Sequence, residues 1–111
     1  MKHNIINKGV HCKIRVHGNG LIAGTNYTAV LYSNPNKTEG RASVTAEAEA
    51  IEEVDNGTTT QEVSCLFDFT PEDTVNLIRG NAILEVYDTE SKEQMMYDDN
   101  YATVRSTSLS N

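Results

Sequence analysis

The chain has 111 residues, of which 38% are hydrophobic, and its formal net charge is −7. This length allows one domain with enough buried surface to fold without metal or disulfide cross-links, and no apolar run approaches the ~20 residues of a membrane-spanning helix. The acidity argues against nucleic acid as a partner, because phosphates would repel most of the surface.

Residues 1–9 show no periodicity, and we expect an N-terminal arm there. They also lack the apolar segment of a secretory signal, so the chain is expected to fold in the cytoplasm where it is made. From residue 10 to residue 17 apolar side chains alternate with His11, Lys13, Arg15 and His17. This alternation predicts a strand with one apolar and one basic face. A turn follows at 18–20, then a strand over 27–32 that ends at the Ser33-Asn34-Pro35-Asn36 sequence.

The segment 42–54 is ambiguous, because its alanines and glutamates favour a helix. The Asn56-Gly57 pair that follows is a strong signal for a two-residue hairpin turn. A turn centred there pairs small or β-branched residues with the larger ones of the next strand. The pairs are Ala50 with Val63, Ala48 with Cys65, Ala46 with Phe67, and Val44 with Phe69. We therefore predict a hairpin, with the helix as the alternative.

The sequence from Phe67 to Asp88 predicts a crossover between two sheets. Alternating apolar residues end at Phe69, and Thr70-Pro71-Glu72-Asp73 supplies an N-cap hydroxyl, a proline at the first helical position and acids over the free N–H groups. Gly80 ends the helical turn, and a new strand covers 81–87. Turns at 88–91 and 98–100 then separate strands over 93–97 and 101–107.

These elements predict an all-β fold. We expect an immunoglobulin-like antiparallel β-sandwich of about seven strands, with one short helical turn near 71–78. A single domain over 10–107 would follow the arm at 1–9 and precede a C-terminal tail at 108–111. Cys12 and Cys65 could be bonded across such a sandwich, but without zinc-site spacing and in a reducing compartment we expect free, buried thiols.

A strand ending F-D-F-T, a capped P-E-D-T turn, L-x-x-G and a strand L-E-V-Y-D together span residues 67–88. This pattern resembles the immunoglobulin-like modules of tailed-phage virion proteins, over roughly residues 60–105. Such modules occur in capsid auxiliary or decoration proteins and in baseplate or tail components. The chain departs from them at Asn81-Ala82, where a tyrosine often follows the glycine. The resemblance implies a fold and a structural role, and it carries no catalytic residues.

Several acidic and histidine residues are candidates for chemical sites. Asp88, Glu90 and the Asp98–Asn100 turn could offer oxygens to calcium if their turns met, but the spacing matches no EF-hand and such residues are ordinary in turns. Glu47 and Glu49 could form a carboxylate pair, although a solvated acidic face explains them. His11 and His17 would lie about 20 Å apart on one strand. We expect no enzyme activity, no metal and no cofactor.

Charge is unevenly distributed along the chain. Residues 1–41 carry a net charge of +5 and residues 42–100 carry −13. This polarity favours electrostatic alignment with protein neighbours, although a basic first strand among acidic strands of one fold would also explain it. The candidate interface residues are Lys8, Lys13 and Arg15, together with Met96. On the strand predicted over 93–97, Met95 and Tyr97 would lie on one face and Met96 on the other. Met96 could then form part of an adaptable contact surface, or both faces could be buried in the core.

The function that these observations favour is that of a structural virion protein. We expect a capsid auxiliary (decoration) protein that binds the capsid exterior, with the major capsid protein as its partner and no nucleic acid or membrane contact. Its location would be the virion, assembled in the host cytoplasm. A tail or baseplate adaptor is the first alternative. A glycan-binding surface domain that stacks tyrosines on sugars is the second. Homo-oligomerisation is left open.

Overall fold

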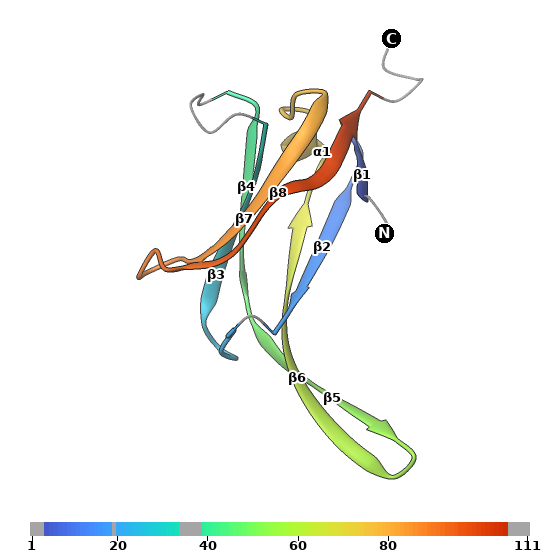
Figure 1. Ribbon diagram of the computed structural model, residues 1–111, viewed down its shortest axis with the longest axis vertical. Helices are drawn as coiled ribbons and strands as arrows, with labels where there is room; N and C mark the ends of the chain where they lie inside the picture. Colours follow the sequence, from blue (N-terminus) through green and yellow to red (C-terminus); the bar gives the residue numbers. More distant parts are fainter. Residues whose placement is uncertain (1–3, 19, 34–38, 107–111) are drawn as a thin grey trace.

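The computed structural model describes residues 4–18, 20–33 and 39–106. Two β-sheets pack face to face (Figure 1). The larger sheet has the strand order β1 (Asn4–Asn7), β8 (Gln94–Arg105), β7 (Gly80–Asp88), β3 (Asn26–Tyr32) and β4 (Arg41–Glu47). The smaller sheet has the order β2 (Cys12–His17), β6 (Thr58–Phe69) and β5 (Glu49–Asp55). One short helix, α1 (Pro71–Thr74), lies between β6 and β7. Over the residues described, the predicted all-β sandwich with one short helical turn is confirmed.

The strand order corresponds to that of immunoglobulin-like sandwiches. Strands β2, β6 and β5 take the places of B, E and D, and strands β8, β7 and β3 take those of G, F and C. Strand β4 adds an edge beyond β3, as the extra strand of variable-type domains does. Each ladder is antiparallel except the one between β1 and β8, which is parallel.

The expected N-terminal arm is wrong for residues 4–7. They form β1, which pairs with the last strand from Asn4–Ala102 to Asn7–Arg105. Ile6 is the one apolar side chain that this strand buries, and it is 3% exposed. A four-residue edge strand with one inward side chain has no periodicity to detect, which explains why the sequence pattern missed it. The C-terminal tail predicted at 108–111 lies outside the described residues.

The core lies between the inner faces of the two sheets. Tyr27 and Leu31 of β3 face Phe67 and Phe69 of β6, and all four side chains are almost fully buried. On β2 the inward residues Ile14 and Val16 are 3% and 4% exposed, while the residues between them are exposed, as their alternation predicts.

The segment 41–55 is extended, and no helix forms there. The Asn56-Gly57 turn and the Ala50–Val63 pair are confirmed, and the ladder runs from Asp55–Thr58 to Glu49–Ser64. Both turn residues have positive φ, 52° and 78°, as a tight hairpin turn requires.

The predicted pairing beyond this point is wrong. At Ala48 the strand bends and joins the other sheet, where Ala46 pairs with Tyr27 and Val44 pairs with Ala29. Backbone hydrogen bonds hold the bend, because the Ala48 N–H donates to the Thr25 carbonyl and the Gly24 N–H donates to the Ala48 carbonyl, both at 2.9 Å. Val44 and Ala46 still pack against the core that contains the phenylalanines. Small side chains fit opposite the phenylalanines across the core as well as beside them in the same sheet. Side-chain size alone therefore could not predict which sheet Val44 and Ala46 would join.

The predicted crossover after Phe69 is confirmed. Thr70 and Asp73 form a reciprocal capping box at the start of α1, and the chain passes from the smaller sheet to the larger one. The helix ends at Thr74, earlier than expected. The buried Thr74 hydroxyl donates to the Val10 carbonyl at 2.8 Å and so ties the crossover to the segment before β2.

The turn predicted at 98–100 is also wrong, because β8 is continuous from Gln94 to Arg105. The ladder passes from Leu84–Asp98 to Ala82–Ala102, so β8 carries extra residues there as a bulge. Asp and Asn residues suit bulges as well as turns, which is why the sequence suggested a chain reversal.

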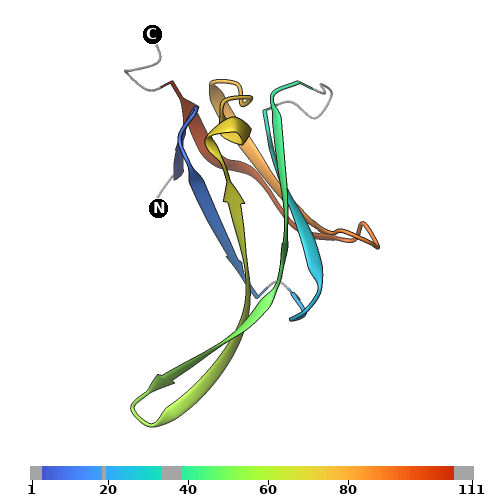
Figure 2. The ribbon, with the colours of Figure 1, turned by 180° about the vertical axis from the view of Figure 1, so that it is seen from behind.

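The β5–β6 hairpin extends well beyond the sandwich (Figures 1 and 2). Strand β2 pairs with β6 only from Ser64 to Phe69, so the part of β6 before Ser64 has β5 alone as a neighbour. We call residues 49–63 the hairpin arm. It helps to give the molecule a radius of gyration of 15.2 Å, above the ~13 Å typical of a compact domain of this length.

Candidate protein-interaction surface

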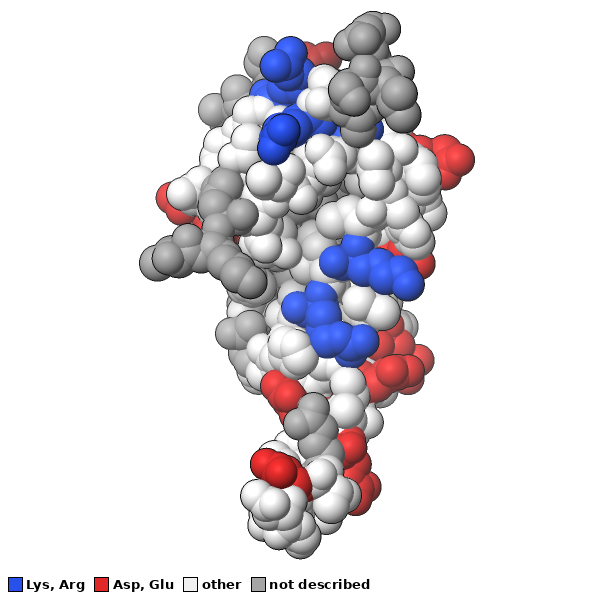
Figure 3. Space-filling view, turned by 90° about the vertical axis from the view of Figure 1, so that its right-hand side faces the viewer, with Lys and Arg blue, Asp and Glu red and all other residues white. Residues whose placement is uncertain are grey.

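The outer face of β2 carries the predicted basic residues Lys13 and Arg15, and both are exposed. Figure 3 shows lysine and arginine side chains gathered on this side of the molecule, with acidic side chains concentrated toward the hairpin arm. The strand places them there because Ile14 and Val16 occupy the inward positions. We call Lys13 and Arg15 the basic strip.

Acidic and polar groups of β6 border the basic strip. Lys13 lies opposite Asp68 in the ladder, and the Arg15 guanidinium donates to the Ser64 hydroxyl at 3.0 Å. At the ends of the strand, His11 contacts the Asp68 carboxylate, and His17 Nδ1 lies 3.1 Å from the Glu62 carboxylate. The strip is therefore held in a fixed register on the sheet, and both cationic side chains remain open to solvent.

Lys8 does not belong to this strip. It follows β1, is half-buried, and its backbone N–H donates to the Arg105 carbonyl at 2.8 Å. The structure thus places Lys8 at the end of β8.

Met96 lies opposite Val86 on β7 and packs, half-buried, against the main core. Met95 also packs against that core, so the interpretation of these methionines as core residues fits better than that of an exposed contact surface. Their neighbour Tyr97 is 51% exposed and pairs with Glu85.

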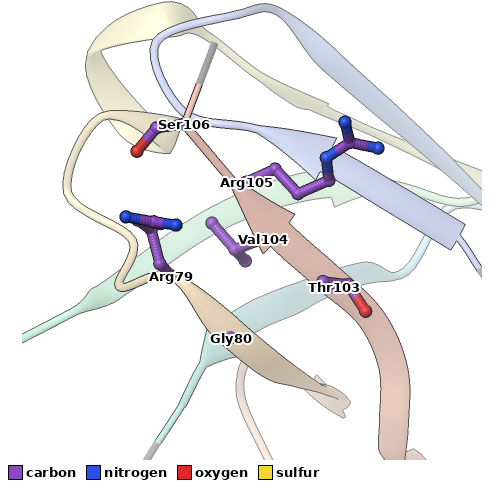
Figure 4. Close-up of a pocket in the computed structure, with 6 residues that line it drawn as sticks. All are labelled: Arg79, Gly80, Thr103, Val104, Arg105 and Ser106. Atoms are coloured by element: carbon purple, nitrogen blue, oxygen red, sulfur yellow. The ribbon is translucent and has the colours of Figure 1, made fainter. Parts of the chain in front are cut away.

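A hollow at the end of β8 was not found from the sequence. It has a volume of about 640 Å³ and lies where β7 begins and β8 ends (Figure 4). Its lining residues are Arg79, Gly80, Thr103, Val104, Arg105 and Ser106. The ladder pair Gly80–Val104 brings the two arginines together from positions 26 apart in sequence. The one sequence feature that could have drawn attention to this hollow is that Arg79 is one of only two lysine or arginine residues between 42 and 100.

The hairpin arm is strongly acidic. Residues 49–63 contain five acidic residues and no lysine or arginine. The bend at Ala48 puts Glu47 and Glu49 on strands of different sheets, so they do not form the carboxylate pair considered from the sequence. Charged side chains on an edge strand protect its backbone against pairing with other chains.

The calcium site considered from the sequence is not assembled. Asp98 lies opposite Leu84, four residues from Asp88 on β7, a separation of about 13 Å along the strand. The Asp88 carboxylate instead accepts hydrogen bonds from the backbone N–H groups of Glu90 and Ser91. No group of three or more potential metal ligands occurs within the described ranges.

The two thiols are free, as predicted. Both lie on β strands of the smaller sheet, where Cys12 pairs with Phe69 and Cys65 pairs with Val16. Burial raises the pKa of Cys65 to about 11, helped by the nearby charge of Glu49, and burial also raises the pKa of Cys12. These thiols stay protonated at neutral pH and act as small apolar core groups.

Most tyrosines are engaged inside the fold. Tyr27 is 1% exposed, and its hydroxyl accepts a hydrogen bond from the Ile22 backbone N–H at 2.9 Å. Tyr32 is 4% exposed and lies under the Arg41 guanidinium at 4.6 Å from the ring centroid. Among the five tyrosines Tyr97 alone is more than one third exposed. This arrangement gives little support to stacking of several sugars on a tyrosine platform.

Comparisons of the chain with protein-family models, with curated proteins and with solved structures gave no match. No helix in the described part of the chain is long and apolar enough to cross a lipid bilayer.

Proposed function

We propose that this chain is a structural module that binds other proteins through its charged surfaces. The observation that carries the proposal is the basic strip, where Lys13 and Arg15 stand exposed on the outer face of β2 in an otherwise acidic molecule. A compact patch of cations steers an acidic partner into one orientation and excludes basic ones.

We further propose that the assembly is a tailed-phage virion and that the chain is a capsid auxiliary protein on the capsid exterior. Support comes from the sequence resemblance over residues 60–105 and from the two-sheet sandwich with its capped crossover. The partner would be an acidic region of the major capsid protein. A tail or baseplate adaptor would use the same surface and would differ in copy number.

The test is to assemble particles with the double variant Lys13→Glu and Arg15→Glu. We expect several-fold fewer bound copies than with the wild-type chain, because each reversal replaces an attraction by a repulsion. Quantitative mass spectrometry of the purified particles measures the copies. The matched control is Arg41→Glu with Lys92→Glu, which reverses two charges that lie over tyrosines of the larger sheet.

Copy number also separates the alternatives. A capsid auxiliary protein should be present in hundreds of copies and an adaptor in few. Unchanged attachment of the Lys13 and Arg15 variant at every salt concentration would contradict the proposal.

A further inference from the structure

The two ends of the molecule carry opposite charges. The Cα atoms extend 51 Å along the longest axis, and Figure 1 shows the β5–β6 turn at one end of this axis and the final residues of β8 at the other. The first end is the acidic hairpin arm. The second end holds the hollow formed around Arg79 and Arg105.

The hollow offers two cations to a ligand. Arg79 and Arg105 are both exposed, and within the described ranges neither makes an ion pair with a carboxylate. In Figure 4 the Arg79 side chain stands at the start of β7, and the Arg105 side chain extends from the end of β8 on the other side of Val104, away from Arg79. Guanidinium groups bind carboxylates through two parallel hydrogen bonds, so a pair of them around one hollow suits an acidic ligand.

The hairpin arm offers a matching ligand. Its last ladder pair is Asp55–Thr58, so the Asp55 carboxylate stands beside the turn at the very tip. Glu52 is exposed farther down the same strand. A two-stranded tip is narrow, and the hollow of about 640 Å³ falls within the size range of ligand-binding pockets.

We propose that the hairpin tip of one copy docks at the arginine hollow of a second copy, where its exposed carboxylates, Asp55 foremost, meet Arg79 and Arg105. The two contacting surfaces differ, so the contact is head-to-tail and its repetition gives a ring or an open filament. This inference is independent of the proposed function, because the basic strip on β2 takes no part in the contact.

The test is sedimentation velocity of the full chain at about 0.05 M and about 0.5 M salt, where screening differs strongly. We expect concentration-dependent association at the lower salt and its loss at the higher. Arg79→Glu with Arg105→Glu, or Glu52→Lys with Asp55→Lys, should each weaken association at least about tenfold. All four side chains are exposed, so these changes leave the core intact.

An equimolar mixture of the two variants provides the decisive measurement. Each variant repels itself at the contact, but together they restore one acidic and one basic partner at every contact, so association should return. The matched control, Glu90→Lys with Glu93→Lys at the β7–β8 turn, changes the net charge equally and should associate at least as well as wild type.

Three results would overturn the proposal: a wild-type chain that stays monomeric at low salt, variants that associate as wild type does, or a mixture that stays monomeric. Titration with inorganic phosphate tests whether the hollow binds a small anion instead of the hairpin tip. Saturable phosphate binding that needs both arginines, without self-association, would assign the hollow to small anions instead.

Discussion

The thiol of Cys65 is a polarisable group that is almost fully buried in the core. Its side chain is 1% exposed, and its thiol lies 3.5 Å from the Ala46 carbonyl across the sandwich, as a donor in a weak hydrogen bond. Removing the proton would place a charge in the apolar interior and near Glu49, which is why the pKa rises.

The raised pKa predicts a loss of stability at alkaline pH. The unfolded thiol loses its proton near pH 9.0 and the folded thiol near pH 11, so the free energy of unfolding should fall as pH rises through this window. The fall from this group is on the order of 2 kcal/mol. Urea unfolding between these pH values measures it, and Cys65→Ala should show a shallower fall. Equal slopes for the two chains would contradict the prediction.

At the scale of elements, the hairpin arm and the sandwich have different sources of stability. Along the arm Val54 is 70% exposed and Ile51 is half-buried, whereas β6 beyond Val63 enters the core with Cys65, Phe67 and Phe69. An isolated two-stranded hairpin is marginal in water, so the arm depends on the sandwich and the sandwich gains little from the arm.

Shortening the arm tests this separation. Replacing residues 51–62 by Asn-Gly leaves the Ala50–Val63 pair next to a two-residue turn and keeps the register. We expect the free energy of unfolding to stay within about 1–2 kcal/mol of wild type, because the removed segment buries little apolar surface. Chemical denaturation measures this. Failure to fold would show that the arm belongs to the cooperative core.

The sequence predicted the elements whose signals are local. The Asn56-Gly57 turn and the capped crossover after Phe69 each depend on neighbouring residues, and each is confirmed. The strand predicted from alternation along residues 10–17 is confirmed from Cys12 to His17, whereas Val10 lies outside it and is exposed. The bend at Ala48 was missed because it depends on which strand lies beside β4. The basic strip on β2 followed from alternation, but the arginine hollow did not, since Arg79 and Arg105 meet only through the β7–β8 ladder.

At the scale of the whole molecule, the long axis is also the direction along which the charge varies, from the acidic hairpin arm at one end to the arginine hollow at the other. The axis of 51 Å compares with 33 and 25 Å for the other two, and the acidic arm occupies one end of the long axis. Contacts through the ends and contacts through the β2 face would therefore give assemblies of very different outline.

Small-angle scattering distinguishes these outlines. A head-to-tail pair should reach roughly 100 Å in maximum dimension, nearly twice the length of one copy, because the end-on contact adds the two long axes. A side-by-side pair would keep nearly the length of a single copy and would contradict the end-on contact. The arm-shortened chain is the control, and it should scatter as a monomer at all concentrations.

The bend at Ala48 has a mechanical consequence. One strand of the hairpin continues through Ala48 into β4, which is bonded along its length to β3, and the other continues along β6 beside β2. A pull on the tip therefore loads both ladders parallel to their strands. In that direction the hydrogen bonds of a ladder resist together instead of opening one after another, so tension applied at the arm is shared between the two sheets.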